Sequence, residues 1–410
     1  MSRYAWLGVF WGVVLVGLFS TGLHAEGGFL YGTIITDDGD KLTGRIRWDK
    51  NEGSWDDILD ANKIRKDRHS RSRDKKISIF GIEIFSEGST WSSTSQAGLR
   101  FGYIEKIIRR SGRRSSIILK GGEKIKFDGG ADLSSSIRGI LIDDVEEGII
   151  KLDWNDIEEV RFSPLTLEYK PSREFLGFRL YGTVETESGI EFEGFIQWDV
   201  DEIWSTDILD GDQRSRGRKI PFRRIKKIEK LSSRASRITL VNERTLKLSG
   251  SNDVDRDNRG IVIMVPDWGR VKVEWDEFEA VTFKPAPEKF VRTYDDYKAP
   301  WRLRGTVYTE YGDQYTGEIT WDDDEKYSWE FLDGEYRDME FDIEFAHIHR
   351  IKKRTTSSCE VTLHSGDKFR LRGSNDVNDE NKGIFVLTDD GEEIEIEWDD
   401  FEKVEFAEGR

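Results

Sequence analysis

Two polar loops contain the residues best suited to bind a metal ion. Gly250 to Ile261 reads GSNDVDRDNRGI, and Gly373 to Ile384 reads GSNDVNDENKGI. Both loops place oxygen-bearing side chains at alternate positions, the spacing by which calcium loops direct several ligands to one side. The pattern indicates calcium as the ion and gives a set of candidate ligands: Asp253, Asp255, Asp257, Asp376, Asn378 and Glu380.

The same loops can also be interpreted as simple turns. A hand-type calcium loop needs Gly at its sixth position and Glu at its twelfth, and here these positions hold Asn258 and Met264. The corresponding stretch in the first third of the chain, GGADLSSSIRG, retains only Asp132 as an acid. Asp and Asn side chains often hydrogen-bond their own backbone in turns. We therefore expect no resident cofactor, with calcium as the alternative.

Tryptophans beside acids form a second candidate site. The segments SWDDILD, WSTDILDG and SWEFLDG each place a Trp a few residues before an Asp. Aromatic rings on loops can stack on sugars or anchor a protein partner. The alternative is that each Trp fills one end of a folded unit, because large aromatic residues are usually buried. The candidate ligand-binding residues are Trp55, Trp204, Trp329, Asp60, Asp210 and Asp333.

Known catalytic motifs do not occur in the sequence. It has no nucleophile elbow, no phosphate-binding glycine loop and no zinc-protease helix. Paired carboxylates of the kind that hydrolyse glycosides can still occur among 80 acidic residues. We predict a protein that is not an enzyme, and we keep a carbohydrate-active or metal-dependent enzyme as the alternative.

The elements that position these residues come from a tandem repeat. In three segments that align without a gap, a Gly lies 16 residues before a Trp: YGTIITDDGDKLTGRIRWD, YGTVETESGIEFEGFIQWD and RGTVYTEYGDQYTGEITWD. In a second block Gly129, Gly250 and Gly373 each lie 25 residues before a Trp. The chain is therefore expected to contain three equivalent units.

Spacing and proline content give the domain boundaries. The first repeat carries 29 extra residues between the two blocks, in a basic insertion at about 63–98. We predict repeat domain 1 at 28–163, a linker at 164–177, repeat domain 2 at 178–284, a linker at 285–300 and repeat domain 3 at 301–410.

Apolar residues within each repeat alternate with a period of two, as in Val271, Val273 and Trp275. This period places one face of a strand against a core. For the second half of repeat two we predict strands at about residues 237–242, 244–249, 260–265, 269–275 and 280–283, with a 3₁₀ turn before the last strand.

Each repeat also divides into two similar halves. Phe222, Ile225 and Ile228 have the same spacing as Trp275, Phe278 and Val281, which lie 53 residues later. Five short strands with a turn before the last one are similar in layout to the small barrels of the Src-homology 3 and Sm-like type. We predict an all-β fold of three tandem repeat domains, each built from two small five-stranded β-barrels. The alternative is one ten-stranded sandwich per repeat.

The first 25 residues have the pattern of a secretory signal peptide. Arg3 precedes an apolar run from Ala5 to about Phe19, and small and polar residues follow before Ala25. An uncleaved membrane anchor is the alternative, because Leu23 is a poor residue near the cleavage point. After cleavage we expect no membrane span, and the single Cys359 excludes an intrachain disulfide. We predict export to the periplasm or the exterior of a bacterium.

Charge is distributed unevenly along the chain. Residues 28–163 contain 24 basic and 24 acidic residues, whereas residues 301–410 contain 14 basic and 30 acidic residues. This asymmetry favours orientation on a charged surface or head-to-tail self-association. Basic runs in repeat one make a polyanion binder an alternative, although export and net acidity disfavour nucleic acid. We predict a binding or structural module of the bacterial envelope or exterior, with a glycan or a protein as partner.

Overall fold

The computed structural model describes residues 28–64, 78–79, 82–83, 94–166, 169–172, 175 and 177–409. The fold is all-β, and within these ranges the only helices are three-residue 3₁₀ turns. No helix in the described part of the chain is long and apolar enough to cross a bilayer. The predicted signal peptide and most of the basic insertion lie outside the described residues.

Repeat one forms a ten-stranded antiparallel sheet with the order β11-β10-β2-β1-β12-β7-β8-β9-β3-β6. Its strands are β1 (Tyr31–Thr36), β2 (Lys41–Trp48), β3 (Ile58–Ile64), β6 (Thr94–Arg100), β7 (Ile104–Arg109), β8 (Arg114–Leu119), β9 (Lys124–Asp128), β10 (Ile140–Asp144), β11 (Gly148–Leu152) and β12 (Ile157–Phe162). Two short strands of the insertion, β4 (Ser78–Ile79) and β5 (Ile82–Glu83), pair only with each other among the described residues.

Repeat two has the same strand order as repeat one. Its own ten strands run β16-β15-β19-β18-β17-β22-β13-β14-β20-β21, which is the order of repeat one read from the other edge. They are β13 (Tyr181–Thr186), β14 (Glu191–Gln197), β15 (Ile208–Gln213), β16 (Arg216–Pro221), β17 (Ile225–Ser232), β18 (Ala235–Leu240), β19 (Thr245–Ser249), β20 (Ile261–Val265), β21 (Gly269–Val273) and β22 (Phe278–Phe283).

Repeat three divides its strands between two sheets. Eight of them form the sheet β29-β28-β27-β32-β23-β24-β30-β31, while β25 and β26 extend the sheet of repeat two to twelve strands through β21. The strands are β23 (Arg304–Thr309), β24 (Gln314–Thr320), β25 (Phe331–Glu335), β26 (Met339–Glu344), β27 (Ile348–Thr355), β28 (Ser358–Leu363), β29 (Lys368–Leu371), β30 (Ile384–Thr388), β31 (Glu393–Ile396) and β32 (Phe401–Phe406). A sheet edge therefore joins repeats two and three.

The strands predicted for the second half of repeat two are confirmed. The structure places β18 to β22 within about two residues of the predicted bounds, the usual uncertainty at strand ends. The expected 3₁₀ turn occurs in repeat one as η3 (Trp154–Asp156), whereas residues 275–277 of repeat two form an ordinary turn. Hydrophobic alternation was sufficient for the strands that bury one face, whereas β20 has four buried residues in succession.

Separate small barrels are not what the strand pairing shows. Among the described strands each sheet runs from one edge to another without closing into a barrel. In repeat one, both halves belong to a single sheet, and this sheet curls over a shared core. The ring of Trp48 at the end of β2 lies 5.8 Å from that of Phe101, which follows the edge strand β6.

One glycine of each repeat is required by a close approach of two strands. A Cβ atom on Gly182 in β13 would lie 2.3 Å from the carbonyl oxygen of Thr282 in β22. The equivalent distances at Gly32 and Gly305 are 2.2 and 2.3 Å. These contacts give a physical reason for the Gly that opens each aligned segment.

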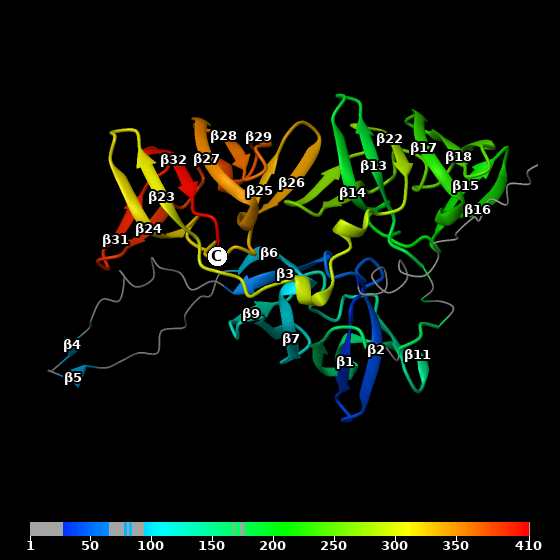
Figure 1. Ribbon diagram of the computed structural model, residues 1–410, viewed down its shortest axis with the longest axis horizontal. Coiled ribbons are helices and arrows are strands. Elements are labelled where there is room, and N and C mark those ends of the chain that lie inside the picture. Colours follow the sequence, from blue (N-terminus) through cyan, green and yellow to red (C-terminus); the bar gives the residue numbers. More distant parts are fainter. Residues whose placement is uncertain are drawn as a thin grey trace, which may run out of the picture.

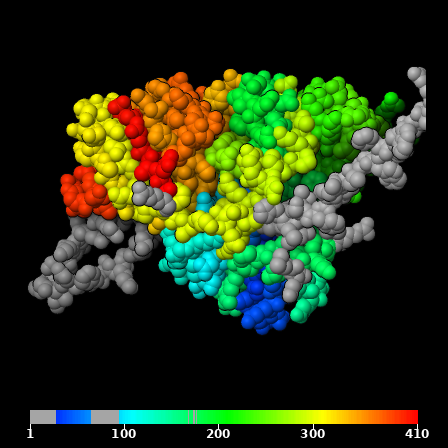
Figure 2. Space-filling view, in the orientation of Figure 1, coloured from blue at the N-terminus to red at the C-terminus, as the bar shows by residue number. Residues whose placement is uncertain are grey.

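Buried ion pairs hold the three repeats together. In Figure 1 repeat one, in blue and cyan, lies beneath repeat two, in green, and repeat three, in yellow to red. The space-filling view shows the same close packing (Figure 2). Arg100 of repeat one binds Glu344 of repeat three at 2.8 Å, and neither side chain is exposed. Arg179 at the start of repeat two binds Asp57 of repeat one at 2.5 Å.

The predicted linker at 285–300 packs against repeat one. Its η7 turn (Tyr294–Asp296) places the Tyr294 hydroxyl 3.1 Å from the carbonyl oxygen of Ile104. The Tyr297 hydroxyl donates to Asp56 at 2.5 Å. Because both rings are buried in the core of repeat one, this segment fixes the position of repeat three rather than acting as a loose spacer.

Candidate functional site

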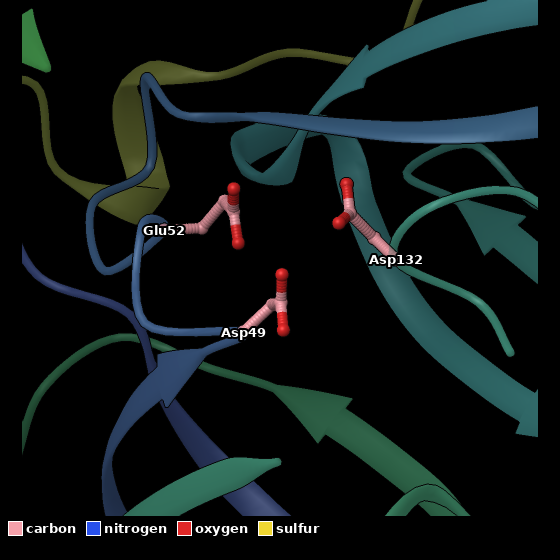
Figure 3. A group of neighbouring side chains, drawn as sticks. All are labelled: Asp49, Glu52 and Asp132. Atoms are coloured by element: carbon pink, nitrogen blue, oxygen red, sulfur yellow. The ribbon is translucent and has the colours of Figure 1, made fainter. Parts of the chain in front are cut away.

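Each repeat gathers three acidic side chains at one point, and we call these groups the acid triads. In every triad one carboxylate oxygen from each residue lies within 4.8 Å of the others. Figure 3 shows that the carboxylates of triad one point toward a common space. The triads are Asp49, Glu52 and Asp132 (triad one), Asp199, Glu202 and Asp253 (triad two), and Asp322, Glu325 and Asp376 (triad three).

A tryptophan and a tight turn position each triad. In repeat two, Trp198 and Glu202 exchange backbone hydrogen bonds of 2.8 and 3.0 Å, which closes the turn that carries Asp199. The indole N–H of Trp198 donates to the carbonyl oxygen of Asp253 at 3.0 Å. The same indole bond measures 3.0 Å in the other two repeats. The core Trp therefore brings two distant loops together.

The turn adopts a strained conformation that is kept in all three repeats. Asp199 and Val200 have φ angles of 50° and 51°, in the left-handed region that residues other than Gly rarely enter. A β-branched residue is especially unfavourable there. The first two turn residues of repeats one and three also have positive φ. Strain of this kind is often retained at functional sites.

Two of the three acids in each triad have defined partners. The backbone N–H of Asp210 donates to Asp253 at 2.5 Å, and those of Asp60 and Asp333 make the equivalent bonds at 2.5 and 2.8 Å. A cationic residue holds the first Asp: Arg259 binds Asp199 through its backbone N–H at 2.6 Å and its guanidinium at 2.9 Å. Arg138 and Lys382 occupy this place in the other repeats.

The glutamate of each triad keeps an oxygen without a partner. The Oε2 atoms of Glu52, Glu202 and Glu325 are buried and accept no hydrogen bond within the described part of the chain. Glu52 is only 3% exposed. A buried polar atom without a partner costs free energy. The same atom is left in this state three times, at the centre of three equivalent acid groups.

Burial and mutual repulsion raise the pKa values of the triad acids. Burial, followed by the charges of Asp253 and Asp199, raises the pKa of Glu202 to about 9. Burial also raises the pKa of Asp253 to about 6 and that of Asp376 to about 8. The pKa values of Glu52 and Glu325 lie well above the ordinary range for the same reason. Without a cation, Glu202 holds a proton at neutral pH.

The charge and geometry of a triad fit a hard divalent cation. Three carboxylates and one Arg or Lys leave two negative charges, which a divalent ion would neutralise. Carboxylate oxygens are the ligands that calcium and magnesium prefer. Two oxygens on opposite sides of a calcium ion lie about 4.8 Å apart, because each Ca–O distance is about 2.4 Å. The carboxylates of all three triads lie within that limit.

A polar cavity of about 660 Å³ lies between the three repeats and includes triad three in its wall. Arg270 of repeat two crosses this region and binds Asp60 of repeat one through two bonds of 2.8 and 2.9 Å. Lys63 of repeat one binds Glu330 and Asp324 of repeat three at 2.5 and 3.1 Å. The cavity exists only because the repeats pack in this arrangement.

The structure separates the predicted calcium ligands. Asp253 and Asp376 belong to triads two and three, but their alternating neighbours do not join them. Asp255 accepts a backbone hydrogen bond from Asp257 at 3.1 Å, and Asn378 accepts one from Glu380 at 2.8 Å. These are the local turn bonds of the alternative interpretation. Alternation along the loop therefore does not bring these six residues together.

The predicted aromatic contacts are buried. Trp55, Trp204 and Trp329 are 0%, 7% and 1% exposed, so their rings are not available as surface platforms. Their burial agrees with the alternative that these rings fill the interior. Trp329 lies at the wall of the central cavity together with Asp60 and Asp333, whereas Trp55, Trp204 and Asp210 do not line it.

Sequence reasoning missed seven of the nine triad residues. The sequence carries a usable signal, since Trp-Asp-x-x-Glu occurs in all three repeats as WDKNE, WDVDE and WDDDE. Asp132 was taken as the remnant of a degenerate loop, but it is the one acid of that loop that the triad uses. An Asp is present at the position of Asp132 in all three repeats, and this was the signal in the sequence that pointed to the triads.

Comparisons with models of protein families, with curated protein sequences and with solved structures found no match to this chain.

Proposed function

We propose that this chain is an exported, non-catalytic β-repeat protein whose acid triads bind divalent cations, with calcium as the preferred ion. The observation that carries the proposal is the buried, unpartnered Oε2 of Glu52, repeated at Glu202 and Glu325. A calcium ion would provide the missing partner and replace the retained proton. Extracellular calcium modules bind with dissociation constants of about 10⁻⁴ to 10⁻³ M, which suits an exported protein.

A binding or structural role is favoured over catalysis in triad one. Glu52 and Asp132 are each 3% exposed, and a catalytic metal needs an open position that a substrate can reach. In this proposal the ions crosslink the turn after β2 to the loop after β9 and its equivalents. They stabilise the repeats as modules of the bacterial envelope or exterior.

The central cavity is the proposed ligand site. Its wall combines acids, Arg270, Lys63 and the edge of Trp329, a mixture that suits a small polar ligand such as a glycan unit. Triad three belongs to this wall, so a calcium ion bound there would lie next to the ligand. This refines the glycan-binding prediction by moving the site from exposed loops to the interface between repeats.

The first experiment measures cation binding directly. The purified chain is dialysed against calcium and analysed for bound metal, and its thermal unfolding is followed in calcium, magnesium and EDTA. We expect up to three calcium ions per chain and a higher melting temperature in calcium. The triple variant E52Q/E202Q/E325Q should lose both effects. The matched control changes three exposed glutamates, Glu158, Glu191 and Glu243, to Gln. Failure of the parent chain to bind metal would overturn the proposal.

The second experiment tests the cavity. A glycan array is probed with the calcium-loaded chain, with the E325Q variant and with E52Q. Binding through the cavity should be lost in E325Q and in EDTA but retained in E52Q, because only triad three borders the cavity. Equal loss in both variants would assign calcium a general stabilising role without a part in ligand binding.

A further inference from the structure

The junction between repeats two and three is a β-sheet pairing whose two strands have equivalents in the other repeats. At the junction β21 pairs antiparallel with β26, from Gly269 opposite Ile343 to Val273 opposite Met339. The equivalent of β21 in repeat three is β31, and the equivalent of β26 in repeat two is β16. Among the described residues, β31 and β16 are edge strands that pair with only one neighbour each.

These two edges lie at opposite ends of the molecule. In Figure 1 β31 lies at the left end of the upper row of strands and β16 lies at its right end. Between them the strands form a nearly continuous ribbon, because the bridge between Glu335 and Arg372 connects the twelve-stranded and eight-stranded sheets. A contact between β31 of one copy and β16 of the next would continue this ribbon. Such a head-to-tail contact leaves one unpaired strand edge, β16 or β31, at each end of the assembly.

Charge is complementary across the internal junction. On β21, Arg270 forms an ion pair with Asp342 of β26, and Lys272 pairs with Glu340 at 3.3 Å. Opposite charges on directly paired residues stabilise a sheet, whereas like charges destabilise it. The junction therefore joins a basic edge to an acidic edge.

The two outer edges are also complementary, with the signs exchanged. The edge β31 reads EIEI, and Glu393 and Glu395 are exposed. The edge β16 reads RGRKIP, and its first four residues are exposed. Charged residues on edge strands normally prevent aggregation. Here the charges disfavour pairing of β16 with β16 and of β31 with β31, but they favour pairing of β31 with β16.

We propose that the chain assembles head to tail through antiparallel pairing of β31 with β16 of a second copy. The register follows from that of the internal junction. Ile396 is equivalent to Val273, because they lie two residues before Trp398 and Trp275 respectively. Arg216 is equivalent to Met339, because they lie six residues before Phe222 and Phe345 respectively. The expected pairs are Glu393 with Lys219, Ile394 with Arg218, Glu395 with Gly217 and Ile396 with Arg216.

This contact is weaker than the internal junction for three reasons. Phe341, which stacks on Trp268 with ring centroids 6.0 Å apart, is replaced by Arg218. Pro221 stands at the position of Glu344, whose N–H donates to the carbonyl oxygen of Trp268 at 2.8 Å, and proline has no N–H. Glu392 replaces Gly269, where a Cβ would lie 2.0 Å from the carbonyl oxygen of Asp342. We therefore expect reversible, salt-sensitive association over four residue pairs.

The test is a charge exchange followed by sedimentation velocity. The variants K219E and E393K each place like charges opposite one another, so self-association of each should weaken by at least about tenfold. An equimolar mixture restores opposite charges at every junction and should recover the association of the parent chain. The matched control is K247E, which makes the same charge change on β19, a strand already paired on both sides.

Measurements are made in calcium-free buffer at about 20 mM and about 500 mM salt, because screening weakens pairs between exposed charges. We expect concentration-dependent mass for the parent chain and K247E at low salt, and its loss at high salt. Recovery in the mixture also shows that both variants are folded. A parent chain that stays monomeric at all concentrations, or a mixture that fails to recover, overturns the proposal. The result does not depend on the proposed cation binding.

Discussion

Replacing Glu202 by Gln should raise stability in EDTA at alkaline pH, and calcium should narrow the difference between the variant and the parent chain. The pKa of Glu202 is raised from 4.5 to about 9, mainly by burial. Between these two pH values the folded chain binds one more proton than the unfolded chain. Its free energy of unfolding therefore falls by about 1.4 kcal/mol for each pH unit. The contribution of the neutral Glu202 carboxyl to the free energy of unfolding is fully present below pH 4.5 and is lost as the pH rises through 9.

The magnitude at pH 8 follows from the same shift. Over the interval from the ordinary pKa of 4.5 to pH 8, the loss amounts to about 5 kcal/mol. Gln keeps the shape of the side chain but does not ionise, so E202Q avoids this loss. In EDTA at pH 8 the variant should be more stable than the parent chain by a few kcal/mol. At pH 5 the two should be nearly equal.

Calcium should narrow this difference in stability. A bound ion neutralises triad two of the parent chain and adds about 3 kcal/mol at a concentration of 100 times the dissociation constant. The variant lacks the charged ligand at that triad and gains less. The assay is urea unfolding followed by tryptophan fluorescence at pH 5 and pH 8, with and without calcium. The control is E191Q, an exposed change on β14 of the same repeat.

Two outcomes would refute this reasoning. If E202Q is less stable than the parent chain in EDTA at pH 8, the carboxyl is not held neutral by burial and by its acidic neighbours. If calcium stabilises both chains equally at pH 8, Glu202 is not a ligand, even if calcium binds elsewhere. A parallel response in E191Q would show that the effect comes from net charge alone.

Three further predictions concern packing. The change E344Q removes the closer of the two carboxylates that pair with buried Arg100, the other being Asp56 at 3.6 Å, and urea unfolding should show a loss of about 3 kcal/mol; a loss below about 1 kcal/mol would contradict a buried pair. In G182A the new Cβ lies 2.3 Å from the carbonyl oxygen of Thr282, and β13 must shift, so we expect a cost of about 1–3 kcal/mol by the same assay. The change W55A removes a fully buried ring, and calorimetry should show a loss of about 3–5 kcal/mol. An unchanged melting temperature in either of the last two variants would mean that the local packing relaxes without cost.

The acid triads mark the limit of what the sequence could predict. Asp49 and Glu52 lie in one turn, but Asp132 follows β9 and reaches them only because the sheet curls and the indole of Trp48 binds its carbonyl oxygen. Alternation along a loop says which side chains share a face of that loop. It does not say which other loop lies opposite. The predicted set of six ligands therefore contained two that the triads use.

The expected exposure of the tryptophan rings fails for a related reason. Trp204 lies in a loop rich in acids, and local composition suggested an exposed ring. The ring instead packs against Phe29 of repeat one, with the centroids 5.1 Å apart. Contacts between repeats bury the Trp204 ring. These contacts could not be predicted from the sequence of a single repeat.

The sequence by itself determined the strands, their number and the equivalence of the repeats, because hydrophobic alternation and repeated glycine spacing act locally on the backbone. Only the tertiary structure decided which strand edges meet, which charges are buried and which acids converge. Those outcomes depend on contacts between segments far apart in the chain. Arg270 shows this directly: its position in β21 follows from alternation, but its partners Asp60 and Asp342 come from the two other repeats.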